Sequence, residues 1–447
     1  MIRQEQDKFA KSIFIVSLFV FALTFMIYKY RLIPDSPGYI EMAASREPFY
    51  PFFLFIFRFI FKNYYLYAAS IAQNLLAAYA VYFAVINIKR LFNLNKLIAC
   101  LIFMIFLAPF FLTIIFSRTG VVISCSVCTE AVTMPLYYIY FTLIIKYILN
   151  HELKNYVEAI ILSLILALTR GQLLMLFIIN FFAMIFACKK FIKPLLIMLA
   201  SFILAMLISR CYFYITHGKF IGNTYGPVAA APAVLLSGSM SDAALFKDDE
   251  IREIYIKIMR EIDEKGYKEH YRLSNLEIFK SGKSSEAVYD ELRLYTGSVI
   301  YNYAADKGLS GLEAEIARDK IAANIIKTII KSPDFIKNFI RVYLSWAAVG
   351  FVNSVAFVHP VLNIYAGFIY IIALSLLIIC VKNKLNREAL FMFFVMLALT
   401  GFVTSVSLVV TPISRYVFYG LPFLYAAIVT CFIKIILNLN LNNHDMQ

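Results

Sequence analysis

Tryptophan, cysteine and internal repeats are scarce or missing in this chain of 447 residues. Tryptophan occurs once, at Trp346, whereas phenylalanine occurs 42 times and tyrosine 30 times. Aromatic rings favour the membrane–water boundary, so we expect tyrosine to take that role. No repeat of fixed period is visible, which argues against a transporter built from inverted repeats. No small-residue cleavage site follows the apolar residues 12–28, and we interpret them as a retained anchor.

The seven cysteines give little support for a metal site or a disulfide framework. Most of them lie in apolar segments, where cysteine behaves as a small hydrophobic residue. Cys125 and Cys128 form a C-x-x-C motif near the predicted start of a helix, with no second pair in the sequence. A metal or redox role for this motif stays open, but packing is the more common role of an isolated pair.

Acidic residues are outnumbered by basic ones, 28 to 42, and the formal net charge is +14. In a soluble protein this excess would suggest nucleic-acid binding. Here 62% of the residues are hydrophobic, whereas soluble domains average under half. The chain is therefore expected to lie in a lipid bilayer with no nucleic-acid partner, and most lysines and arginines of its short loops fit orientation signals.

The apolar segments predict an all-α fold, a polytopic transmembrane helical bundle of about 10–11 spans, some of them short or re-entrant. Residues 1–215 form an N-terminal membrane region. Residues 216–338 are polar, with apolar residues at helical spacing, and predict a mainly helical extracytoplasmic domain. Residues 339–447 form a C-terminal membrane region. Lysine and arginine near the N-terminus place that end in the cytoplasm, so the protein is expected in the cytoplasmic membrane with its active face outside.

Three segments do not fit simple spans. The phenylalanine-rich residues 48–62 contain Arg58 and Lys62, which favours a helix in the membrane interface. Residues 157–188 are too long for one span and short for two, and they predict two short helices with Arg170 at the outer tip. An arginine at bilayer depth is costly unless it reaches water or an anion. Residues 341–358 predict a helix that is only partly inserted.

The stretch Pro34-Asp35-Ser36-Pro37-Gly38-Tyr39 places one carboxylate on a stiff turn directly after the first span. By the predicted topology, ionisable and aromatic residues from several loops share its membrane face. They are Asp35, Tyr39, Arg46, Arg118, Glu130, Arg170, His359, Arg415 and Tyr416. A carboxylate that accepts a proton, together with several cations that hold a phosphate, suits transfer from a polyprenyl phosphate.

An acidic residue after the first span, followed by Arg46-Glu47-Pro48-Phe49-Tyr50-Pro51, resembles the GT-C superfamily of polytopic membrane glycosyltransferases. The resemblance implies an inverting enzyme with Asp35 as general base and Glu130 as a second acidic position. It also implies that Arg170, Arg415 and Arg118 bind the donor phosphate. Tyr39, Arg46, Tyr416 and His359 are then the candidate substrate-binding residues. Several branches of the family pair two acidic residues at the first site, whereas Ser36 follows Asp35 here. A divalent cation stays open as a cofactor, and no metal ligand is assigned.

Six of these nine residues also have a structural explanation. Asp35 fits the turn, and Glu130 fits the start of a helix, where the dipole favours a carboxylate. Arg46 and Arg118 fit charges that reach the lipid headgroups, and Arg415 fits a structural ion pair. His359, before Pro360, fits a span boundary.

The sequence thus predicts an integral membrane glycosyltransferase. Its donor would be a sugar on a polyprenyl phosphate, and its acceptor a lipid-linked or surface glycan. The alternatives are a transporter or flippase of lipid-linked glycans, which would place charged residues near the middle of several spans, and a glycan polymerase.

Overall fold

The computed structural model describes residues 2–116, 122–187, 191–268, 285–356, 360–412 and 417–444. Within these ranges every regular element is a helix, apart from an isolated parallel bridge between Arg31 and Ser126. Eight described helical segments are long and apolar enough to cross a membrane. They are Asp7–Tyr28, Phe49–Leu91, Glu130–Asn150, Ile192–His217, Phe335–Asn353, Leu362–Lys382, Asn386–Ser407 and Phe418–Asn438. Lys96–Leu112 and Gly171–Ala187 are shorter apolar helices. The predicted all-α, polytopic helical bundle is confirmed.

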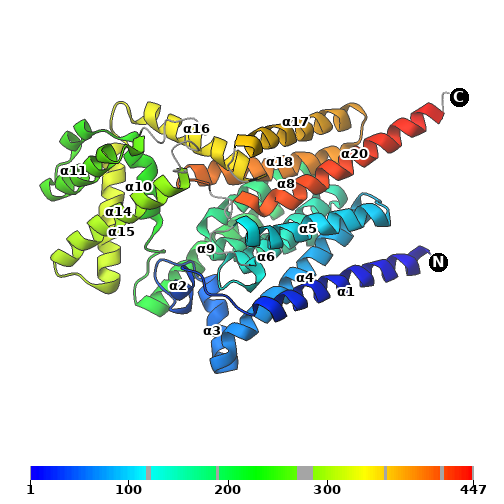
Figure 1. Cartoon of the computed structure of the whole chain (residues 1–447), viewed down its shortest axis with the longest axis horizontal. Coiled ribbons are helices and arrows are strands. Elements are labelled where there is room, and N and C mark those ends of the chain that lie inside the picture. Colours follow the sequence, from blue (N-terminus) through cyan, green and yellow to red (C-terminus); the bar gives the residue numbers. More distant parts are fainter. Residues whose placement is uncertain are drawn as a thin grey trace.

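The N-terminal membrane region consists of long helices joined by short loops. Its first part contains α1 (Ile2–Tyr28), α2 (Ser36–Ile40), α3 (Phe49–Phe61), η1 (Lys62–Tyr64), α4 (Tyr65–Leu91), α5 (Lys96–Phe116), η2 (Ile123–Cys125) and α6 (Glu130–Asn150). The helix predicted over residues 48–62 corresponds to α3, which bends sharply away from α4 (Figure 1). The bend follows from Lys62, whose φ of 47° cannot continue a helix.

The segment around Arg170 folds as two short helices, as predicted. Helix α7 (Leu153–Thr169) ends because Arg170 has an extended backbone with φ −154° and ψ 122°. A 3₁₀ turn, η3 (Gly171–Met175), then leads into α8 (Leu176–Ala187), and α9 (Ile192–His217) follows. The broken backbone holds Arg170 at the end of a helix rather than in the middle of one.

Four helices form a head region with its own core. They are α10 (Gly226–Ser237), α11 (Asp249–Glu264), α14 (Ser285–Asp306) and α15 (Gly311–Ile329), with the 3₁₀ turn η4 (Met240–Leu245) between the first two. On α11, apolar residues recur every three or four positions, and Ile251, Ile258 and Ile262 are buried. The head core also takes in Trp346, whose ring meets Tyr289 edge to face at 5.8 Å.

The C-terminal membrane region begins with a helix that also packs into the head core. Its elements are α16 (Phe335–Asn353), α17 (Pro360–Lys382), α18 (Asn386–Ser407), η5 (Phe418–Gly420) and α20 (Leu421–His444). The partly inserted helix expected over 341–358 is α16, which starts at Phe335 because this ring and Val342 pack into the head core. Helix α16 therefore crosses the predicted boundary at residue 338 and joins the head region to the membrane part.

Figure 1 shows both chain ends at one end of the molecule and α10, α11, α14 and α15 at the other. The first and last membrane regions share one core, in which Phe106 contacts Phe423 edge to face at 4.9 Å. The loops that precede α2 and α6, and the break at Arg170, lie near the head region, because Asp35, Thr129 and Arg170 line one cavity with residues of α14. This arrangement brings short segments from distant parts of the sequence to one place.

Candidate functional site

The loop between α1 and α2 and the loop before α6 are joined by backbone hydrogen bonds. The nitrogen of Arg31 donates to the Cys125 oxygen at 2.8 Å, and the nitrogen of Val127 donates to the Arg31 oxygen at 2.9 Å. The Ser36 hydroxyl donates to the Val127 oxygen at 2.8 Å and accepts from the Ile33 nitrogen at the same distance. Ser36 is fully buried. Ser36 stands where several GT-C branches have a second acidic residue. Here it joins the two loops that carry Asp35 and Glu130.

Asp35 forms an ion pair within its own loop. Its Oδ1 lies 2.9 Å from Nη2 of Arg46, and the guanidinium also stacks over the Tyr39 ring, 4.7 Å from the centroid. A Cβ at Gly38 would stand 2.8 Å from Nε of Arg46, so a larger residue there would require the guanidinium to shift. Burial raises the pKa of Tyr39 to about 12, which keeps its hydroxyl protonated. The structure therefore brings together three of the predicted site residues.

Glu130 and Arg170 form a second ion pair, and this one is buried. Nη1 of Arg170 lies 2.8 Å from Oε1 of Glu130 and donates to the Tyr419 hydroxyl at 2.9 Å. The two side chains are 13% and 6% exposed. Glu130 is the first residue of α6, where the helix dipole also favours its charge. The structural explanation of Glu130 is confirmed, because it begins a helix. Its role as a second acidic position of the site stays a prediction.

Glu47 is the prominent cavity residue that the sequence reasoning missed. Its Oε1 accepts a hydrogen bond from Nδ2 of Asn223, in the linker between α9 and α10. The same linker is fixed by the nitrogen of Thr224, which donates to the Ala44 oxygen at 3.0 Å. Burial is the main cause that raises the pKa of the Glu47 carboxyl to about 7. Glu47 stood within the Arg46–Pro51 run, but nothing in the sequence shows that residue 223 folds back onto it.

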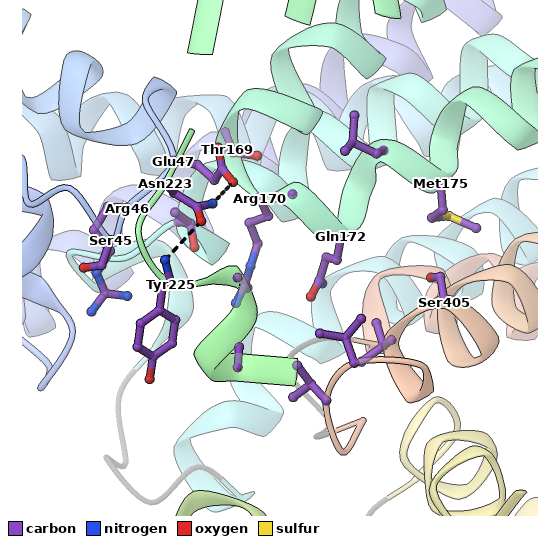
Figure 2. Close-up of a pocket in the computed structure, with 18 of the residues that line it drawn as sticks. Ser45, Arg46, Glu47, Thr169, Arg170, Gln172, Met175, Asn223, Tyr225 and Ser405 are labelled. Atoms are coloured by element: carbon purple, nitrogen blue, oxygen red, sulfur yellow. Dashed lines mark hydrogen bonds between the residues drawn. The ribbon is translucent and has the colours of Figure 1, made fainter. Parts of the chain in front are cut away.

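These residues line a cavity of about 1030 Å³. Its polar wall contains Asp35, Tyr39, Ser45, Arg46, Glu47, Thr129, Thr169, Arg170, Gln172 and Asn223. Its apolar wall comes from η3, α8 and α9, with Met175, Phe177, Ile178, Phe181, Met198, Leu199 and Phe202. Figure 2 shows Arg170 and Gln172 side by side, between the Glu47–Asn223 pair and Met175 with Ser405.

The head region closes the cavity with aromatic and charged side chains. Tyr225, Tyr289, Asp290 and Arg293 line it. Nη2 of Arg293 lies 3.2 Å from Oδ1 of Asp290, and the guanidinium is 5.5 Å from the centroid of the Tyr225 ring. A cation over an aromatic ring is stabilised by the quadrupole of the ring. The helical spacing of residues 289 and 293 is visible in the sequence, but their place in the wall of the cavity that Arg170 lines is not.

Four predicted site residues, Arg118, His359, Arg415 and Tyr416, lie outside the described residues. Their roles stay predictions. Over the described ranges, no group of three or more His, Cys, Asp and Glu side chains is arranged to hold a metal ion.

The Glu47 carboxyl gives a pH-dependent prediction for stability. Its pKa is raised in the folded chain, so its ionisation destabilises the fold as pH rises from about 4.5 to 7, and the penalty is complete above pH 7. We expect Glu47→Gln to stabilise the protein by about 1–3 kcal/mol at pH 8 and to have little effect at pH 4.5. Thermal unfolding in detergent at both pH values measures this difference.

Glu41→Gln is the matched control, because Glu41 is an exposed carboxyl in the same loop. It should leave the melting temperature unchanged at both pH values. A Glu47→Gln variant that gains no stability at pH 8 would show that the folded protein accommodates the ionised carboxylate without penalty.

No protein-family model, curated protein or solved structure matches this chain.

Proposed function

We propose that this chain is an integral membrane glycosyltransferase of GT-C type. It would take a sugar from a polyprenyl-phosphate donor and transfer it to a lipid-linked or surface glycan. The observation that carries the proposal is the two-sided cavity: one wall is apolar and formed by α8 and α9, and the other contains the arginines and carboxylates. A ligand with a long hydrocarbon tail and a charged head group would match both walls.

The apolar wall supports a lipid tail that enters from the bilayer. Ile178 is 58% exposed, Leu199 46% and Phe202 38%, although all three line the cavity. In a membrane, side chains exposed in this way on α8 and α9 face hydrocarbon, so a prenyl chain could pass between lipid and cavity without crossing a polar barrier. The tail would then lie along these helices with its phosphate toward Arg170.

The polar wall supports departure of the phosphate. When the bond between the sugar and the phosphate breaks, the phosphate gains negative charge, and a cation fixed nearby stabilises the transition state more than the ground state. Arg170 is held by Glu130 and Tyr419, so it is already oriented before substrate binds. Tyr225 and Tyr289 also line the cavity and would give a bound sugar an aromatic surface.

The proposed location is the cytoplasmic membrane, with the cavity on the extracytoplasmic side. Lys89 and Arg90 end α4 and Lys96 begins α5, so all three flank the short α4–α5 connection. Arg3, Lys8 and Lys11 belong to the N-terminal segment. Short loops rich in lysine and arginine stay in the cytoplasm. The cavity belongs to the loops toward the head region, which is the opposite end of the molecule from the N-terminus (Figure 1).

Ligand binding tests the proposal with simple probes. We expect a long-chain polyprenyl phosphate to raise the melting temperature of the purified protein in detergent, because it occupies both walls. A polyprenol of the same length and inorganic phosphate are the controls, and each should give a much smaller shift. Equal stabilisation by the polyprenol would mean that the cavity does not recognise phosphate, and the proposed donor would be wrong.

A further inference from the structure

The carboxylates around the cavity differ in one respect, which is whether an arginine already neutralises them. Asp35 pairs with Arg46 and Asp290 pairs with Arg293, at 2.9 and 3.2 Å. Glu130, directly behind the polar wall, pairs with Arg170. An arginine within hydrogen-bond distance stabilises the ionised carboxylate and occupies its lone pairs. Each of these three groups is therefore a weak acceptor for a proton from a substrate hydroxyl.

Glu47 is different. Within the part of the chain that the structure describes, it forms no ion pair, and its hydrogen-bond partner is the neutral amide of Asn223. The charged side chains that share the cavity with it are Asp35, Arg46, Arg170, Asp290 and Arg293. Burial raises the pKa of the Glu47 carboxyl to about 7, so at neutral pH a large fraction is ionised and the basicity exceeds that of an ordinary carboxylate.

Glu47 also lies next to the arginine that would hold the donor phosphate. A Cβ on Gly171 would stand 3.1 Å from Oε1 of Glu47, so the carboxylate touches the backbone one residue beyond Arg170. Figure 2 shows Glu47 and Arg170 at the same part of the cavity. Glu47 comes from the loop between α2 and α3, and Arg170 lies between α7 and η3. An acceptor hydroxyl held between them would meet a proton acceptor and the reacting end of the donor together.

We infer that Glu47, rather than Asp35, is the catalytic base of this cavity, an assignment that rests on the proposed function. The acceptor hydroxyl gives its proton to the Glu47 carboxylate as its oxygen forms a bond to the anomeric carbon of the donor sugar. The bond between that carbon and the phosphate oxygen breaks, and its electron pair leaves with the polyprenyl phosphate, beside Arg170. Asp35 positions Arg46 and Tyr39, and Asn223 positions the Glu47 carboxyl.

The first test needs no substrate. Dicyclohexylcarbodiimide is apolar and reacts with protonated carboxyls, so we expect it to modify Glu47 at pH 6 and far less at pH 8.5. Peptide mass spectrometry of the full-length protein in detergent reads the modified residue, and Asp35 and Glu130 serve as internal controls because each forms an ion pair with an arginine. Labelling of Asp35 or Glu130 without labelling of Glu47 would overturn the assignment.

The second test compares two isosteric variants in single-turnover transfer from a polyprenyl-phosphate sugar. Glu47→Gln should lower the rate about 10²- to 10⁴-fold and abolish the rise of the rate between pH 6 and 8. Asp35→Asn should lower the rate less and keep that rise. The reverse pattern would make Asp35 the base. The wild-type protein could also transfer no sugar from any donor although Glu47 is labelled as expected. That result would contradict the proposed function but not the raised proton affinity of Glu47.

Discussion

Arg170→Ala is expected to lower the rate of sugar transfer about 10²- to 10³-fold, the loss typical of removing one group that stabilises a developing negative charge. The structure gives the reason. Arg170 lies at a break between two short helices, faces the cavity and is held by Glu130 and Tyr419 before substrate arrives. Single-turnover transfer at saturating donor measures the effect on the chemical step.

The same substitution should also destabilise the protein, and the two effects have to be separated. Without Arg170, the Glu130 side chain is left charged and only 6% exposed, and breaking a buried pair in this way costs about 3–5 kcal/mol. The neutral double variant Glu130→Gln/Arg170→Gln should recover most of the stability, because two amides can hydrogen-bond at this position. It should not recover transfer. A stable double variant with a normal rate would return the pair to a purely structural role.

Leu199→Trp is expected to raise the KM for a long-chain donor about tenfold to a hundredfold, with kcat nearly unchanged. Leu199 lines the apolar wall on α9 and is 46% exposed, so a larger ring would occupy the path of the prenyl chain. Overpacking of a binding surface costs about 1–3 kcal/mol, and each 1.4 kcal/mol is a factor of ten in affinity. Steady-state kinetics with donors of two chain lengths measure the effect.

Leu204→Trp is the control for this substitution. Leu204 lies on the same helix, is 45% exposed and does not line the cavity. It should leave the KM unchanged, and a short-chain donor should be less sensitive to Leu199→Trp than the long one. A KM that rises equally for both donors would mean that the prenyl chain does not follow α9.

The broken segment shows how much of this site the sequence could predict. An arginine in a long apolar stretch is expensive, so residues 157–188 had to bend around Arg170, and the structure confirms the two short helices. An interfacial helix over 48–62 was predicted for a similar reason, because Arg58 and Lys62 interrupt its apolar run. The structure has the helix α3 there, and its place in the interface stays a prediction. In both cases the energetic cost of a charge in an apolar stretch and the local apolar pattern were sufficient to predict the helices.

Partners that lie far apart in the sequence could not be predicted in this way. Glu47 and Asn223 are separated by 176 positions, and no periodicity links a loop near the first span to the linker before the head region. In the sequence, Ser36 stands in place of a second acidic residue. In the structure, its hydroxyl donates a hydrogen bond to the Val127 oxygen in the loop before α6. The first turns of α16, with Phe335 and Val342, pack on a head core that forms only in the folded chain.

The most direct measurement of the central claim is sugar transfer by the purified protein in nanodiscs, from a panel of polyprenyl-phosphate-linked sugars to extracted cell-envelope glycans. The double variant Glu130→Gln/Arg170→Gln, which should keep most of the stability and lose transfer, is the matched control. The account predicts that at least one donor yields a labelled glycan and free polyprenyl phosphate in equal amounts, and that the control yields neither. Movement of intact lipid-linked glycan across liposomes by the same protein, with no sugar transferred from any donor, would contradict the account and indicate a flippase.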